Sequence, residues 1–196
     1  RAQGPLLWPR GGGPCEPCLQ NPTLGQVRGR VVVLQDFGIR WPACYGIPYP
    51  DIFSAQDDWE LASQWDLYKK WEAVKSKLEE AASGPPGRLY MNYLSAASGA
   101  FPYFVASGRQ NPSTQAPRLA TGRLSLKGDG PWPDFPRVHC AFDLCEIAFE
   151  GTNALAAAHL LGGEARVGVV MADFPGRALI DTVIARNRRS GRAKGP

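Results

Sequence analysis

Histidine is scarce in this sequence, and the motifs of several common enzyme classes are missing from it. Only His139 and His159 occur among 196 residues, and neither follows a segment with the pattern of a strand. There is no nucleophile elbow, no glycine-rich phosphate loop and no H-E-x-x-H motif. The sequence therefore lacks the signatures of α/β-hydrolases, P-loop nucleotide hydrolases and zinc proteases.

Long hydrophobic runs are missing as well. No apolar stretch approaches the ~18 residues that a membrane-spanning helix needs, and the chain does not open on a signal-peptide pattern. Because the first residue is Arg1 rather than Met, we expect either a mature form or a piece of a longer chain.

The net charge of +4 arises at the C-terminus, where basic residues occur without an acid. These residues are Arg186, Arg188, Arg189, Arg192 and Lys194. The rest of the chain is close to neutral, whereas a nucleic-acid-binding domain presents a basic patch on its folded surface. The composition therefore argues against nucleic acid as a partner. The basic tail either contacts an anionic membrane surface or is a solvated terminus.

Cysteine is present in an odd number, five, with a single C-x-x-C at Cys15 and Cys18. A structural zinc site needs four ligands, and a redox C-x-x-C begins a helix after a strand. Neither context is present, and the only candidate second half-site is His139 with Cys140 and Cys145. We therefore expect no metal or other cofactor, and we expect cysteines that are incidental or form disulfides.

The alternation of strand and helix patterns predicts an α/β fold. Strands are expected at 30–35, 51–56, 88–94 and 166–172, and helices at 59–82, at 146–161 and around Leu179 to Ile184. The long helix is amphipathic, and its lysines, Lys70 among them, are assigned to the solvent face. Residues 1–27 are irregular, and 100–140 are mostly loop. This order favours a parallel sheet, either doubly wound or part of a barrel.

Polar residues follow the predicted strands at the end where sites form in such folds. Asp173 follows the last strand and is either a helix N-cap or a carboxylate that orients a histidine or binds a cation. Asp57 either forms a capping box with Ser54 at the head of the long helix or, with Trp59, lines a site. Arg28 is either a solvated strand flank or a contact for a phosphate or a hydroxyl-rich ring.

Four segments resemble the catalytic domain of phosphatidylinositol-specific phospholipase C, the X-domain family, in its bacterial and fungal single-domain form. They are 27–34, 56–59, 89–99 and 166–174, and they occur in the family's order. The resemblance covers 27–188, with 110–140 aligning poorly. It implies a (β/α)₈ barrel of the TIM type, and an enzyme that cleaves phosphatidylinositol to diacylglycerol and a cyclic inositol phosphate by attack of the inositol 2-hydroxyl.

The resemblance also implies that only part of the barrel is present. The family's two catalytic histidines and its phosphate-neutralising arginine lie on the first strands, and the Gly/Pro-rich residues 1–26 do not supply them. We expect an irregular segment at 1–26, about four strands of eight at 27–188, and a basic tail at 189–196. The partner would be the missing N-terminal half of the barrel, and the chain alone would be inactive.

The resemblance assigns roles to several residues at the strand ends. Asp173 resembles the carboxylate that orients the general-base histidine, and Arg28 resembles an inositol-contacting arginine. Asp57 and Trp59 resemble an acidic residue and an aromatic that hold the sugar ring. Because the family commonly has tyrosine at the Trp59 position, a stacking face is kept and a hydrogen bond is lost.

Three functions are compatible with the sequence. The first is a secreted phospholipase C-like phosphodiesterase that acts on a phosphatidylinositol or inositol phosphate headgroup at a transient membrane surface, with Tyr49 and Asp51 as further contacts. The second is a non-catalytic module that binds an inositol or glycan headgroup or another protein. The third is a metal-dependent phosphodiesterase that uses Asp57, Asp58 and Asp173.

Overall fold

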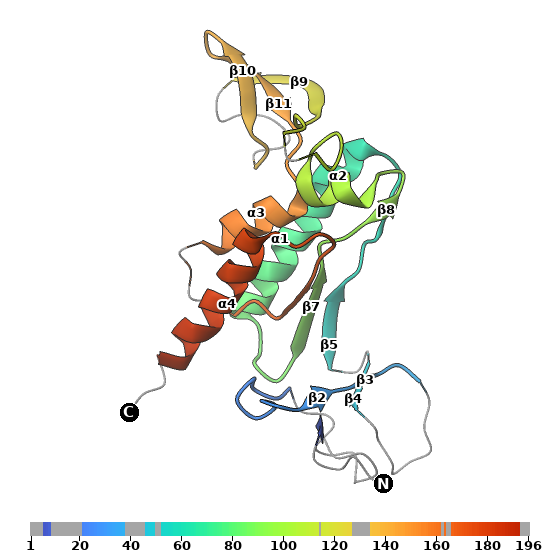
Figure 1. The fold of residues 1–196 in the computed structure, drawn as a ribbon, viewed down its shortest axis with the longest axis vertical. Helices are drawn as coiled ribbons and strands as arrows, with labels where there is room; N and C mark the ends of the chain where they lie inside the picture. The colour runs from blue at the N-terminus through green and yellow to red at the C-terminus, as the bar shows by residue number, and fades with distance from the viewer. Residues whose placement is uncertain are drawn as a thin grey trace. The chain divides into compact units, whose positions relative to one another are not determined.

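A computed structural model describes most of the chain, which divides into two compact units. The described residues are 6–8, 21–37, 46–49, 52–113, 115–126, 134–161, 163 and 166–192. The first unit comprises Arg1–Ser54 with Gly84–Tyr90, and the second comprises Ala55–Ser83 with Met91–Pro196 (Figure 1).

The first unit contains two pairs of very short strands. The parallel pairs are β1 (Leu7–Trp8) with β2 (Val31–Val32), and β3 (Leu34–Gln35) with β4 (Ile47–Pro48). The prediction of one continuous strand at 30–35, buried on both faces, is wrong. Val31 is 56% exposed and Leu34 is 41% exposed. Their composition favours extended backbone, but each half of the run finds only one partner strand among the described residues, so no second layer covers it.

A three-stranded sheet has the strand order β12-β7-β5. Its strands are β5 (Phe53–Gln56), β7 (Leu89–Tyr93) and β12 (Val169–Met171). β12 and β7 are parallel, with Val169 opposite Met91 and Met171 opposite Tyr93. The strands predicted at 51–56, 88–94 and 166–172 are thus confirmed, although each is shorter than its prediction.

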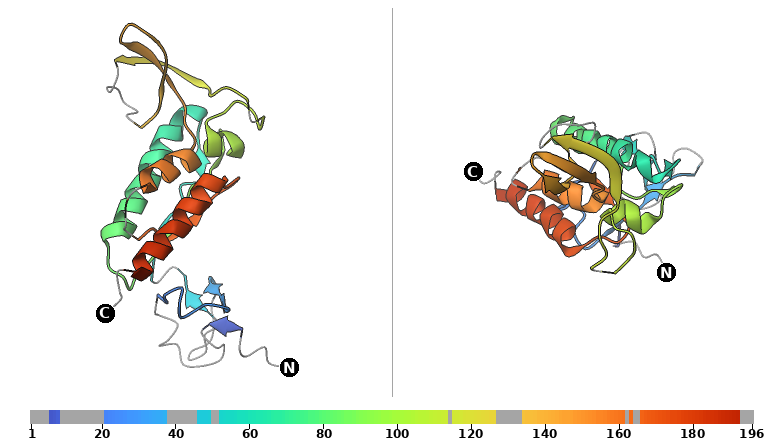
Figure 2. Two further views of the ribbon diagram at one scale, coloured as in Figure 1. Left: turned by 60° about the vertical axis from the view of Figure 1, so that its left-hand side comes forward. Right: turned by 90° about the horizontal axis from the view of Figure 1, so that it is seen from above.

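Helices cover one face of this sheet. They are α1 (Leu67–Ser83), α3 (Thr152–Leu160) and α4 (Arg177–Arg192), whereas α2 (Pro102–Ser107) lies beyond the ends at which the chain leaves β5 and β7 (Figure 1). Figures 1 and 2 show α1, α3 and α4 side by side. Buried apolar residues of α1, including Trp71, Val74 and Leu78, form one hydrophobic cluster with residues of α2, α3 and α4. The predicted helix around Leu179 to Ile184 is confirmed as part of α4.

The long helix begins later than the sequence predicts. A short strand, β6 (Glu60–Leu61), pairs in parallel with β8 (Ala97–Ser98), so the chain is still extended where a helix was predicted. A 3-10 turn, η2 (Gln64–Asp66), precedes α1, and its capping box is formed by Ser63 and Asp66. The predicted capping box of Ser54 and Asp57 is therefore wrong, because the helix that it would cap starts ten residues further on, at Leu67.

An antiparallel sheet occupies much of the segment predicted to be loop. It consists of β9 (Ala120–Leu126), β10 (Arg137–Ala141) and β11 (Leu144–Ala148), with β11 in the middle. The predicted helix at 146–161 is correct only over α3. Its first part is strand β11, and the helix begins after Gly151. A Cβ at Gly151 would lie 2.1 Å from the Ala106 carbonyl oxygen, so this backbone approach requires glycine there.

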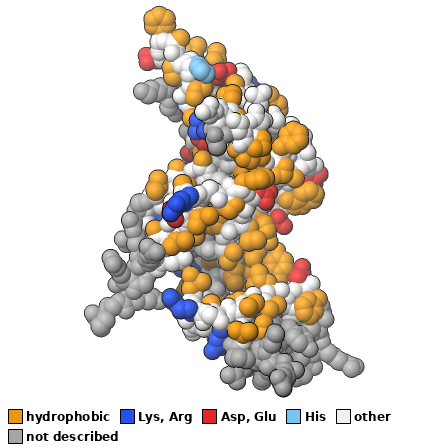
Figure 3. Space-filling model, viewed as in Figure 1, with side chains coloured by type: hydrophobic (Ala, Val, Ile, Leu, Met, Phe, Trp, Pro, Cys, Tyr) orange, Lys and Arg blue, Asp and Glu red, His pale blue; other side chains and the backbone are white. Residues whose placement is uncertain are grey.

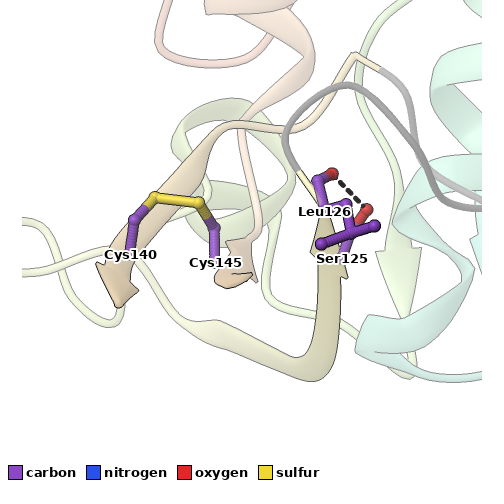
Figure 4. The surroundings of a disulfide bond; sticks show 4 residues. All are labelled: Ser125, Leu126, Cys140 and Cys145. Carbon is purple, nitrogen blue, oxygen red and sulfur yellow. Dashed lines mark hydrogen bonds between the residues drawn. A yellow bond between two sulfur atoms is a disulfide. The ribbon is translucent and has the colours of Figure 1, made fainter. Parts of the chain in front are cut away.

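The turn between β10 and β11 is closed by a disulfide between Cys140 and Cys145 (Figure 4). This pair is therefore disulfide-forming and does not serve as half of a zinc site. Cys15, Cys18 and Cys44 lie outside the described residues. In the described part of the chain, no helix is long and apolar enough to cross a membrane.

Candidate functional site

The carboxyl ends of β5 and β12 carry the acidic residues that the sequence places in a site. Asp57 and Asp58 follow β5, Asp173 follows β12, and all three are exposed. The chain leaves β5 and β7 at the same end of the sheet (Figure 1), and β12 is parallel to β7. Asp57 and Asp173 therefore lie at one edge of the sheet, on either side of the end of β7.

Trp59 lies at the same edge, on a backbone that is held in place. Its carbonyl accepts a hydrogen bond of 2.8 Å from the amide of Ala97, and the Leu61 carbonyl accepts one of 2.6 Å from the amide of Gly99. A Cβ at Gly99 would lie 2.1 Å from the Ala62 carbonyl oxygen, so the close approach of these segments requires glycine. The Trp59 side chain is nevertheless 57% exposed, which leaves its ring available to a ligand.

A buried lysine of α1, Lys70, lies next to this edge. Lys70 is 1% exposed, and its Nζ donates hydrogen bonds to Gln56 Oε1 at 3.1 Å and to the Asp58 carbonyl at 2.7 Å. Burial lowers the pKa of the Lys70 ammonium to about 8, although the charges of Asp58 and Asp57 act in the opposite direction. Lys70 therefore begins to lose its proton, and with it its positive charge, in mildly alkaline solution.

The Gln56 side chain links Lys70 to the neighbouring strand. Gln56 Oε1 also accepts a hydrogen bond of 2.7 Å from the Asp58 amide, and its Nε2 donates to Asn92 Oδ1 at 2.8 Å and to the Tyr93 carbonyl at 2.9 Å. Asn92, 1% exposed, donates in turn to the Val74 carbonyl of α1 at 2.8 Å. This buried network fixes the end of β5 against β7 and α1.

The turn that carries Asp173 is held from α3. Asn153 Nδ2 donates to the carbonyls of Asp173 at 2.8 Å and Phe174 at 3.1 Å. Phe174 has a positive φ of 48°, which is unusual for an aromatic residue, and its ring meets Tyr103 edge-on with centroids 5.4 Å apart. The Asp173 carboxylate itself remains exposed.

The predicted site residues fall in both units. Asp57, Trp59 and Asp173 belong to the second unit, at the edge just described. Arg28 is exposed in a turn of the first unit, and Tyr49 packs edge-on against Phe53 in the same unit. Asp51 lies outside the described residues. A single site that combines Arg28, Tyr49 and Asp51 with the residues of the second unit stays a prediction.

The metal hypothesis finds no support in the described residues. They contain no group of three or more His, Cys, Asp or Glu side chains that could hold an ion. Asp57, Asp58 and Asp173 all lie within the part of the chain that was searched. The interpretation of these three aspartates as one metal site is therefore wrong.

Lys70 was predicted to lie on the solvent face of the long helix, and this prediction is wrong because the side chain is buried. The heptad spacing contained the signal, because Lys70 lies three residues after Leu67 and four before Val74, both fully buried. A lysine at that position of an apolar stripe is unusual. Its partner Gln56 could not be identified from the sequence, because no local pattern pairs a strand glutamine with a helix lysine 14 residues away.

Two solved structures resemble this chain. One is the phosphatidylinositol-specific phospholipase C from Listeria monocytogenes, with 18% identity and a TM-score of 0.52 over 86% of this chain and 48% of that one. The other is the S. aureus phosphatidylinositol-specific phospholipase C, with 21% identity and a TM-score of 0.43 over 86% and 50%. No model of a known protein family matches the chain, and neither does any curated protein.

The chain has a phosphatidylinositol-phospholipase-C-like fold. Its α/β content and its parallel strands β7 and β12 fit the TIM-barrel fold of the Listeria enzyme, which confirms the α/β part of the predicted fold class. The chain spans about half the length of the two structures that it resembles.

Proposed function

We propose that the chain supplies the inositol-binding side of a phospholipase C-like phosphoric diester hydrolase and does not catalyse the reaction alone. The observation that carries this proposal is the placement of Asp57 and Asp173 at one sheet edge, with the exposed ring of Trp59 beside them. Carboxylates accept hydrogen bonds from sugar hydroxyls. An exposed aromatic ring packs against the apolar face of a sugar.

The position of the histidines supports the proposal that the chain does not catalyse the reaction alone. Attack by an inositol hydroxyl needs a base within about 3 Å of its proton. His139 lies on β10, and His159 lies on α3 with its ring 6.1 Å from that of Trp71. Neither follows β5, β7 or β12, so the Asp173 carboxylate has no histidine of the described residues to orient at this edge.

A further part of the barrel would supply the missing groups. Asn92 and Val170 lie opposite each other and face the helices, so Val169 and Met171 face the other side of the sheet. These two are 39% and 44% exposed, whereas parallel sheets are normally covered on both faces. In addition, an apolar groove of about 380 Å³ runs along α4 beside β12, lined by Ile180 and Ile184 among others. Both features are consistent with strands and helices that another segment provides.

We also propose that the protein is secreted and makes transient contact with a membrane surface. The disulfide of Cys140 and Cys145 fits an oxidising compartment, which supports secretion. Hydrophobic side chains reach the surface over the β9–β11 sheet and across the middle of the face in Figure 3, and Phe142 is fully exposed. These surfaces are compatible with transient contact with a membrane that carries the lipid substrate.

The second candidate function is a headgroup-binding module that never acts as part of an enzyme. The same edge of the sheet would bind the headgroup, with the exposed Asp57 carboxylate and the Trp59 indole contacting the inositol ring in the same way. The two functions differ in whether a second polypeptide restores cleavage of phosphatidylinositol.

Titration of the chain with myo-inositol 1-phosphate tests the binding shared by both candidates. We expect weak saturable binding in wild type that falls at least about tenfold in Asp57→Ala and in Trp59→Ala, because each removes one of the contacts. Asp181→Ala and Phe142→Ala are matched controls, since both residues are exposed and lie outside the edge. Equal affinity in all five proteins would overturn the proposal.

A further inference from the structure

The Lys70 side chain contacts the end of β5 from the side of α1. An apolar side chain could fill the same space, so packing alone does not explain the lysine. Lys70 lies on the hydrophobic face of α1, and its Nζ donates hydrogen bonds to Gln56 Oε1 and to the Asp58 carbonyl. The Asp58 amide donates to the same Gln56 oxygen at 2.7 Å. Backbone and side-chain groups on both sides of Asp57 are therefore fixed, while the Asp57 side chain itself is exposed.

We propose that Lys70 is a positioning residue that holds the 56–58 segment in the geometry in which Asp57 and Trp59 meet a ligand. This inference rests on the proposed inositol-binding function. Gln56 is buried toward α1 and β7, and Asp57, the next residue, is exposed to solvent. Side chains alternate along an extended chain, so fixing the Gln56 side chain inward directs Asp57 outward.

The cost of burying this lysine argues that it does more than fill space. A buried cation loses its hydration, and replacement by an apolar residue of similar volume is often neutral or stabilising. A methionine would continue the apolar stripe of Leu67, Trp71 and Val74 without that cost. What methionine cannot provide is the pair of donors to Gln56 and the Asp58 carbonyl.

The charge of Lys70 also acts on the edge itself. The charged groups that interact with the Lys70 ammonium are the carboxylates of Asp58 and Asp57. A phosphate that approaches two carboxylates is repelled, and a cation beneath them reduces this repulsion. Lys70 therefore favours a ring that carries a phosphate, whereas an uncharged ring gains only from the positioning.

The test compares Lys70→Met with wild type and with Lys75→Met. Lys75 is the matched control, because it lies on the same helix and pairs at 2.8 Å with Asp134, away from the network. Hydrogen exchange at the Asp58 amide reads the positioning without any ligand. We expect at least about tenfold faster exchange at Asp58 in Lys70→Met, no change there in Lys75→Met, and a melting temperature of Lys70→Met equal to or above that of wild type.

A second arm measures affinity for myo-inositol 1-phosphate and for uncharged myo-inositol between pH 7 and pH 9.5. We expect wild type to lose affinity for the phosphate as Lys70 loses its proton, while the affinity for inositol stays constant and Lys70→Met shows no such step. Unchanged exchange at Asp58 would overturn the positioning role. Faster exchange without any binding in wild type would leave the positioning intact and overturn the inositol function instead.

Discussion

Lys70 is the residue whose chemistry departs furthest from its ordinary solution behaviour. Its ammonium is buried, two acceptors fix it, and it lies beneath the acidic edge of the sheet. A neutral lysine still has two N–H donors, so both hydrogen bonds survive deprotonation. Loss of the charge therefore changes the electrostatics of the site without removing its hydrogen-bonded support.

This behaviour predicts a dependence of stability on pH. The folded pKa of Lys70 is about 8 and the reference value is 10.5, so between these values the unfolded chain binds the proton more tightly. Lys70 should therefore make the free energy of unfolding rise with pH between these two values. In Lys70→Met this rise should be smaller, because the titrating group is gone. Urea unfolding of both proteins at pH 7.5 and pH 10 measures the difference. A pH dependence identical in the two proteins would contradict the assignment.

Asp134, which precedes β10 and contacts Trp71 and Lys75 of α1, shows the opposite balance. Burial raises its pKa, but hydrogen bonds from Lys75 and from the Trp71 indole at 2.6 Å outweigh that effect, and the net pKa is lowered. Its stabilisation is therefore present above the reference value of 3.8 and is lost as the pH falls below it. Asp134→Asn should destabilise the fold by about 1 kcal/mol at pH 7 and show a weaker loss of stability on acidification, both measurable by urea unfolding. Equal acid sensitivity of the two proteins would show that this pair contributes nothing.

At the scale of elements, the sequence predicted those whose pattern is local and continuous. β7, α1 and α4 carry clear strand or helix periodicity and were found, because their own residues determine which face is buried. The start of α1 was misplaced, since the pairing of Glu60–Leu61 with Ala97–Ser98 involves a segment far along the chain. The β9–β11 sheet was missed because its outward-facing residues, such as Leu124 and Leu144, are apolar and exposed, which hides the usual alternation.

The same limits apply to the candidate site. Asp57, Trp59 and Asp173 could be predicted at a sheet edge because each follows a recognisable strand. The spacing of Lys70 within the apolar stripe indicates that it is buried, but its contact with Gln56 depends on the packing of α1 against the sheet, which no local pattern encodes. Long-range hydrogen bonds are therefore the part of the site that only the structure supplies.

The junction between α2 and α3 depends on one glycine. Gly151→Ala would place a methyl group 2.1 Å from the Ala106 carbonyl oxygen, so the backbone must shift and we expect a loss of about 2 kcal/mol in unfolding free energy. Gly87→Ala is the control, because no atom lies within 4 Å of its Cβ position and stability should hardly change. Thermal unfolding distinguishes the two variants, and equal stability would show that the close approach does not exist.

The disulfide should act locally within the β9–β11 sheet. Cys140 and Cys145 close a short loop, so the replacement of both by serine should cost at most about 2 kcal/mol. We expect faster hydrogen exchange in β10 and β11 and unchanged exchange in α1, which does not depend on this turn. Faster exchange throughout the second unit would mean that the turn supports the whole core.

For the whole molecule, we propose that the chain binds an inositol phosphate headgroup but does not cleave it. The open face of the sheet at Val169 and Met171 and the apolar groove beside β12 are the features that a further part of a barrel would cover. Catalysis would then require histidines from that part, in reach of the Asp173 carboxylate.

A ³¹P NMR spectrum of soluble lysophosphatidylinositol, recorded with and without the chain, tests binding and cleavage together. We predict that the phosphodiester resonance shifts or broadens in proportion to added protein, that Asp57→Ala removes this effect, and that no cyclic inositol phosphate resonance appears. A resonance of the cyclic product would show that the chain is a complete catalyst. An unperturbed spectrum would show that it does not bind the headgroup.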